Sequence, residues 1–277
     1  MKTGTVKMVV RSFYFVLKEN NMIAKYIKTA SMSAQNKTLA GIIYLLPDAL
    51  LRVVCLIPLL MLWRTLMGSG VNTGMQLSQM LSYTYVSALL RELLVISSPL
   101  TNWFYDGALI CVFQRPMSIY GHVAAQTLGA TVPSLLIFSV PMALLSPVFG
   151  VSIIPDSFWF FPSLLLCISL GFAIEFLFAC LFIRMVNATW LAYTLRKALM
   201  SLFSGTIIPF AIMPWGIGRI LAYLPLGSLA GAPLALYTGL AVPGQTIALQ
   251  IIWNIILWPT AILAFRKSQE RMVSHGG

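Results

Sequence analysis

The chain has 277 residues, of which 59% are hydrophobic and only 9% are charged, and its mean hydropathy is +0.88. A soluble domain carries roughly 25% charged residues, so this chain has too little polar surface to cover a water-soluble globule. The composition therefore predicts an all-α, polytopic membrane protein. The net charge is +11, and most of the cations lie outside the apolar stretches. Their placement is a signal of membrane topology and not of nucleic-acid binding.

Residues 1–38 are predicted to form a cytoplasmic amphipathic helix in the plane of the membrane interface. At about 100° per residue, cations such as Lys18 and Lys25 fall on one side, and apolar residues such as Phe13 and Ile23 fall on the other. The alternative interpretation is a solvated basic tail.

Six apolar stretches within residues 39–266 are predicted to span the bilayer. They cover residues 40–63, 77–100, 122–145, 158–183, 195–212 and 246–265. Six spans place both termini on one face, where residues 267–277 form a polar tail. Fourteen Lys and Arg residues lie on that face and only Arg64 and Arg219 on the other, which places both termini in the cytoplasm.

The loop between the second and third spans, residues 103–120, has the pattern of a short amphipathic helix. Its apolar residues recur at helical spacing, namely Phe104, Ala108, Cys111 and Val112, and Asp106-Gly107 marks a turn or a helix start. Arg115-Pro116 marks its end, because proline cannot continue a helix. Such a helix either rests on the bilayer surface or docks onto a soluble partner.

The loop of residues 213–245 is rich in proline and glycine but remains apolar between them. We expect short broken helices that re-enter the outer leaflet. Such backbone is tolerated at that depth only where it is buried in protein or lines a cavity. The segment therefore either caps a substrate path or packs as a plug.

Sequence motifs for catalysis are absent. The chain has no GxxxxGK[ST], HExxH or GxSxG pattern, and its cysteines have no CxxC spacing. We therefore predict no catalytic, cofactor or metal site. The four cysteines are Cys55, Cys111, Cys167 and Cys180.

Charged residues within the predicted spans are candidates for a translocation path, because such groups are costly in lipid and usually face protein or water. Arg91, Glu92 and Glu175 are the three candidates. Glu175 either contacts a substrate, carries a proton or pairs with Arg91. Asp48 and Arg52 are spaced i, i+4 and are expected to neutralise each other.

The loop between the second and third spans, with the sequence YDGALICVFQRPMSIY, resembles the corresponding segment of permease subunits of ABC-2-type transporters. Four residues match the family pattern: Gly107, Leu109, Arg115 and Pro116. A second segment, PLGSLAGAPLALYTG, resembles the proline- and glycine-marked segment before the family's last span. The resemblance covers the whole chain, with Asp106 standing where the family tends to have a small polar residue.

The resemblance implies that residues 103–120 are a coupling helix that docks on a cytoplasmic ABC ATPase, and that residues 1–38 are the elbow helix. It also implies a second permease copy or a similar permease, and two ATPase copies that bind ATP and Mg. The chain itself is then no enzyme and holds no cofactor. The implied ATPase-coupling residues are Asp106, Gly107, Leu109, Gln114, Arg115 and Pro116.

The expected function is therefore that of the membrane subunit of an ATP-driven exporter in a bacterial plasma membrane. Its expected cargo is an amphipathic drug, antibiotic, peptide or lipid-like molecule. The alternative is an ion-coupled secondary transporter that uses Glu175 or Glu92 as its proton site. A third possibility is a non-transporting membrane anchor, in which the intramembrane charges can be replaced without loss of activity.

Overall fold

The computed structural model describes residues 23–39, 41–70, 74–106, 108–185 and 189–274. Within these ranges all regular secondary structure is helical, which confirms the all-α prediction. The chain forms two compact units. The first unit comprises the described parts of residues 1–42 and 98–133, and the second those of residues 43–97 and 134–277.

The first unit contains four helices: one over residues 23–39, α5 (Leu100–Tyr105), α6 (Ala108–Phe113) and α7 (Ile119–Ser134), whose last residue begins the second unit. The second unit contains α2 (Ile42–Gly68), whose first residue ends a segment of the first unit. Its other elements are α3 (Leu77–Leu89), α4 (Arg91–Leu94), the π-helical turn η1 (Leu135–Ser139), α8 (Val140–Leu145), η2 (Ser146–Phe149), α9 (Phe160–Arg184), α10 (Thr189–Phe203), η3 (Phe210–Ile212), η4 (Pro214–Gly216), α11 (Ile217–Tyr223), α12 (Gly231–Tyr237) and α13 (Pro243–Ser274).

In the first unit, the helix of residues 23–39 packs along α7 through small and polar residues. The Tyr26 hydroxyl lies 3.2 Å from Ser118 Oγ, and Ser33 Oγ donates to the carbonyl oxygen of Gln126 at 2.8 Å. Ile23 and Ile27 lie on the exposed side of the helix, as a bilayer-facing residue would. The predicted interfacial helix is thus helical from residue 23, while residues 1–22 lie outside the described part of the chain.

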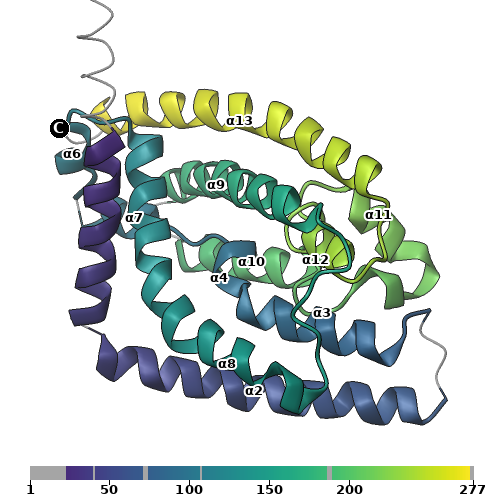
Figure 1. Ribbon diagram of the computed structural model, residues 1–277. Coiled ribbons are helices and arrows are strands. Elements are labelled where there is room, and N and C mark those ends of the chain that lie inside the picture. Colours follow the sequence, from purple (N-terminus) through teal and green to yellow (C-terminus); the bar gives the residue numbers. More distant parts are fainter. Residues whose placement is uncertain (1–22, 40, 71–73, 107, 186–188, 275–277) are drawn as a thin grey trace, which may run out of the picture. The chain divides into compact units, whose positions relative to one another are not determined.

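Helix α9 is central to the second unit, where it contacts α13, α12, α4 and α10 (Figure 1). Its seam with α13 contains amide and indole donors spaced one turn apart. Gln250 Nε2 donates to the carbonyl oxygen of Ser163 at 3.3 Å, and Asn254 Nδ2 to that of Leu166 at 3.2 Å. One turn further along α13, Trp258 Nε1 donates a hydrogen bond to Ser169 Oγ at 2.9 Å. Such bonds hold helices together in lipid, where apolar contact alone gives little preference for a partner helix.

Helix α3 is buried on nearly all sides, and its polar residues bind an irregular segment after α10. The Tyr83 hydroxyl donates to the carbonyl oxygen of Gly205 at 2.6 Å, and Ser87 Oγ to that of Thr206 at 2.6 Å. These bonds satisfy backbone carbonyls where the chain is not helical, as buried backbone requires.

Among the described residues, four helical stretches are long and apolar enough to cross a bilayer, as in a membrane protein: Leu45–Gly68, Ile119–Phe149, Phe160–Arg184 and Pro243–Gln269. Each overlaps a predicted span. The other two predicted spans differ from the structure, because α3 ends at Leu89, inside the stretch of residues 77–100, and α10 ends at Phe203, inside residues 195–212. The third of the six predicted spans, residues 122–145, is not one continuous α-helix. It lies within the consecutive helical elements α7, η1, α8 and η2.

The apolar segment of residues 213–245 consists of broken helices, as its prolines and glycines predict. Helix α12 lies in the core of the second unit, where Leu229, Ala230 and Leu234 pack with Tyr83 and Leu170. Trp215 adopts a positive φ of 57° and is 91% exposed. Burial in protein is a condition under which such backbone is stable at membrane depth.

Candidate functional site

The predicted coupling segment forms two six-residue helices, α5 and α6. The backbone N–H of Asp106 donates to the carbonyl oxygen of Asn102 at the end of α5. Helix α6 ends where predicted, with the N–H of Gln114 bonded to Ile110 and that of Arg115 to Val112. The single helix expected over residues 103–120 is therefore divided near Asp106, and α7 begins at Ile119.

The six residues of α6, ALICVF, are all apolar, so its sides differ in burial and not in polarity. Leu109 and Val112 are buried, whereas Cys111 is exposed. Ile110, 63% exposed, and Phe113, 44% exposed, lie one turn apart beside the buried pair. A two-turn helix is not stable alone in water, so these contacts and any partner that covers the outer face must hold it.

The residues that follow α6 add a cation to this exposed apolar surface. Gln114, Arg115 and Pro116 are all exposed. Arg115 Nη1 lies 3.4 Å from Nε2 of His122, a buried residue of α7 whose ring is 5.7 Å from the Trp103 ring. We call Ile110, Phe113 and Arg115 the coupling surface.

Of the six predicted coupling residues, the structure describes five. Asp106, Gln114, Arg115 and Pro116 are exposed, and Leu109 is buried. Gly107 lies outside the described residues. Leu109 therefore packs against the rest of the first unit. The other four described residues are accessible to a partner.

A second feature is a cleft of about 480 Å³ within the second unit, which we call the polar cleft. It is lined by α2, by the end of α3 with α4, by α10 and by the segment after α10. Arg91 and Glu92, predicted for a translocation path, both line it. Thus two of the three predicted path residues share one cavity.

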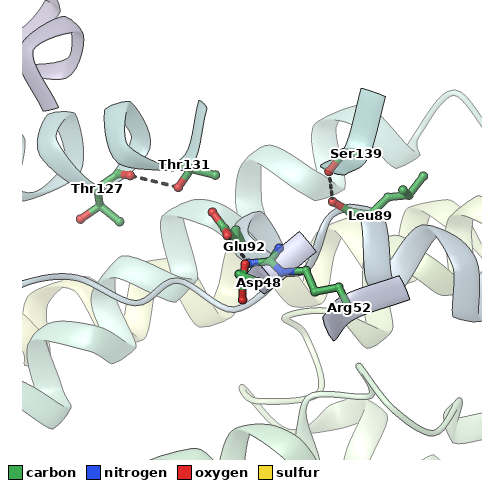
Figure 2. A network of polar contacts seen from close by, with 7 residues as sticks. All are labelled: Asp48, Arg52, Leu89, Glu92, Thr127, Thr131 and Ser139. Carbon is green, nitrogen blue, oxygen red and sulfur yellow. Dashed lines mark hydrogen bonds and ion pairs between the residues drawn. The ribbon is translucent and has the colours of Figure 1, made fainter. Parts of the chain in front are cut away.

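Arg52 lies between two carboxylates in this cleft (Figure 2). Its Nη2 is 2.7 Å from Asp48 Oδ2 and 2.5 Å from Glu92 Oε1. The guanidinium carbon also lies 5.6 Å from the centre of the Phe138 ring. The predicted i, i+4 pair with Asp48 is confirmed, and Glu92 is a further partner that the sequence analysis missed.

Glu175, the third predicted path residue, pairs with Arg196 and not with Arg91. Arg196 Nη2 lies 2.5 Å from Glu175 Oε2, and it also donates to the carbonyl oxygen of Ile96 at 2.5 Å. The Glu175 and Arg196 side chains are only 4% and 9% exposed. The pairing with Arg91 was wrong, because α9 and α10 form a helical hairpin that brings Arg196 to the level of Glu175.

Arg91 and Lys197 complete the charges of the polar cleft. Both line it and both are exposed to it. Within the described ranges, neither forms an ion pair, whereas Arg52 and Arg196 are bound to carboxylates. The cleft therefore has two accessible cations that form no ion pair with a described carboxylate.

The broken helices of residues 213–245 form much of the lining of another, partly open cavity of about 510 Å³. It is largely apolar, and Arg219, Tyr223 and Gln245 are among its polar lining residues. The cavity agrees with the expectation that this segment caps a path, while the burial of α12 agrees with packing. Both roles remain predictions.

Comparison with known proteins found no protein family, no curated protein and no solved structure that matches this chain.

Proposed function

We propose that this chain is the membrane subunit of an ATP-driven exporter and that it binds a separate cytoplasmic ABC ATPase through the coupling surface. In this proposal six membrane-crossing segments include the four long apolar helices and the shorter regions around α3 and α10. The chain forms half of a translocation path with a second copy or a similar permease. Both termini are cytoplasmic, and the membrane is a bacterial plasma membrane.

The observation that carries the proposal is the exposed face of α6. Ile110 and Phe113 are large apolar side chains on a short helix that ends at an exposed arginine and a proline. Aromatic and aliphatic anchors beside an arginine are typical of protein–protein contacts. The family resemblance of residues 103–120 points to the same partner, an ATPase with a complementary groove.

The polar cleft is the proposed contact site for cargo. Buried or partly buried ionisable groups among membrane helices usually face protein or water and mark transport pathways. The cargo class proposed is an amphipathic drug, antibiotic, peptide or lipid-like molecule. ATP and Mg are bound by the partner, and closure of two ATPase copies shifts the permease between two packings.

An assay of the energy source for uptake distinguishes this proposal from ion-coupled transport. In everted membrane vesicles that contain the chain and its ATPase, uptake of a fluorescent amphipathic dye should require ATP. A protonophore should leave the uptake unchanged. Arg115→Glu should reduce ATP-driven uptake by about ten-fold or more, the loss expected from about 1.4 kcal/mol of docking energy, while membrane insertion is unchanged.

One result would contradict the exporter, and another would contradict only its proposed contact with the ATPase. Uptake that a proton gradient supports without ATP would favour a secondary transporter, in which Glu92 or Glu175 must exchange its arginine partner for a proton. Normal ATP-driven uptake by the Arg115→Glu variant would exclude the coupling surface as the point of contact.

A further inference from the structure

The polar cleft is charged at one end and uncharged, with aliphatic side chains, at the other. Along α2 its lining residues run from Asp48 and Arg52 to Leu56 and Leu59. Leu59 lies about 10 Å beyond Arg52, since each helical residue adds about 1.5 Å. This wall of the cleft therefore changes from ionic to aliphatic within two turns.

The second wall runs in the opposite direction, and its charged residues lie at the same end of the cleft. The Arg52–Glu92 ion pair aligns the charged part of α2 with α4, at the end of α3. Thr84, which lies two turns before Arg91 in sequence, therefore falls beside the aliphatic part of α2. Because α2 and the α3–α4 segment run in opposite directions, their charged residues lie at the same end of the cleft.

Helix α10 supplies the third wall. The bond from Arg196 to the carbonyl oxygen of Ile96 places Arg196 and its neighbour Lys197 at the α4 end. Met200 and Ile207 continue the lining away from it, and Ser87 holds the segment that includes Ile207 through its bond to Thr206. All three walls therefore have their charges at one end of the cleft.

The balance of cations and carboxylates determines which charge of ligand the cleft can bind at its charged end. Asp48 and Glu92 are both bound to Arg52, and Glu175 is bound to Arg196. Four cations thus face three carboxylates, and Arg91 and Lys197 are the two without an ion pair in the described part of the chain. In a medium of low polarity, an uncompensated cation favours an anion over water or a neutral group.

We propose that the polar cleft binds an amphipathic anion, with its phosphate or carboxylate head at Arg91 and Lys197 and its apolar tail along Leu56, Leu59 and Ile207. A guanidinium can bind such a head through two parallel hydrogen bonds, and an ammonium adds a flexible point charge. The volume of about 480 Å³ is that of a small-molecule site. As an assignment of cargo this inference rests on the proposed exporter function, but the binding itself does not need an ATPase.

Cys55 provides a direct reporter of occupancy. It lines the cleft between the charged and aliphatic ends and is exposed, whereas Cys167 and Cys180 are buried. The Cys111→Ser change therefore leaves one accessible thiol among the four cysteines. The full-length protein, held in phosphatidylcholine nanodiscs, is treated with a water-soluble maleimide with or without dodecyl phosphate below its micelle concentration.

Dodecyl phosphate should slow the modification of Cys55 by roughly five-fold at about four times its dissociation constant, because only the empty cleft reacts. Dodecyltrimethylammonium, a cation with the same tail, and inorganic phosphate, a head without a tail, should not protect the thiol. Arg91→Gln with Lys197→Gln should abolish protection. Arg266→Gln with Lys267→Gln removes two exposed cations outside the cleft and should leave protection unchanged.

Several results would overturn the proposal. They are equal protection by the cationic amphiphile, equal protection by inorganic phosphate, protection that survives the Arg91→Gln and Lys197→Gln changes, and a thiol that does not react even without ligand. Protection by phosphatidylglycerol nanodiscs alone would support the proposal and identify a membrane lipid as the anion. An ATPase that binds the chain despite a negative labelling result would leave the exporter function standing and remove only this ligand.

Discussion

The Glu175–Arg196 ion pair is the most buried pair of opposite charges described, with both side chains at least nine-tenths covered. Arg196 also binds the carbonyl oxygen of Ile96, so it joins α9, α10 and the end of the α4 region. The desolvation of both ions offsets much of their attraction. The pair therefore matters less for its net energy than for the large cost of leaving one member alone.

We expect Glu175→Gln to destabilise the protein by about 3–5 kcal/mol, because Arg196 would remain charged and buried without its counter-ion. The measurement is unfolding of the purified protein in mild detergent. Combining Glu175→Gln with Arg196→Gln should recover a large part of the loss, since the double variant has no buried charge at this place. Strictly additive losses would show that the two side chains are not coupled.

Asp48→Asn is the matched control for this experiment. Asp48 also binds an arginine, at 2.7 Å, but its side chain is 49% exposed and Glu92 holds the same guanidinium. The expected loss is about 0–1 kcal/mol, as for ion pairs in contact with solvent. A loss as large as that of Glu175→Gln would mean that burial does not set the cost.

Sequence reasoning at this scale succeeded for local pairs and failed for distant ones. The Asp48–Arg52 pair follows from the helical repeat. Glu92 lies 40 positions from Arg52, so the pairing depends on how α2 and α4 pack. The Glu175–Arg196 pair had a usable signal: the two residues lie at similar distances from the loop that joins α9 to α10, so an antiparallel hairpin brings them together.

At the scale of elements, the contact between the helix of residues 23–39 and α7 depends on close backbone approach. A Cβ atom at Gly129 would lie 2.2 Å from the carbonyl oxygen of Ala30 and 2.6 Å from its Cα. Backbone atoms cannot move aside as a flexible side chain can. Gly129 therefore permits the helix of residues 23–39 and α7 to cross with their backbones in close contact.

Gly129→Ala should separate these helices at a cost of roughly 1–3 kcal/mol, the usual range for overpacking. Amide hydrogen exchange of residues 23–39 should become about ten-fold faster for each 1.4 kcal/mol lost. Gly244→Ala is the control, because a Cβ there meets nothing within 4 Å. Unchanged exchange in the Gly129→Ala variant would contradict the close crossing.

Helix ends were predictable where proline or glycine mark them and less so elsewhere. The end of α6 before Arg115-Pro116 follows from the restriction that proline places on its neighbour. The end of α3 at Leu89 has no such residue, and the N–H of Leu90 still bonds to Val86. An apolar count over residues 77–100 therefore could not reveal this end.

At the scale of the whole molecule, composition was sufficient to predict a helical membrane protein. In the part of the chain that the structure describes, four helical stretches have the length and apolarity of spans. The number six came from apolar runs and the asymmetry of Lys and Arg, and it remains a prediction for the regions around α3 and α10. Hydropathy averages over a window and cannot distinguish one long helix from short helices joined by a buried turn.

The central claim for the whole molecule is that the coupling surface binds a soluble ATPase. The measurement is a pull-down of the detergent-solubilised protein, tagged at its C-terminus, from its own cells. The wild type should retain a P-loop ATPase, and Ile110→Asp with Phe113→Asp should lose it. Ile154→Asp, a change at a residue that is 78% exposed outside the coupling surface, should retain it. A protein that is recovered alone, yet transports in liposomes under a proton gradient, would contradict the account and make Glu92 and Glu175 the residues to test.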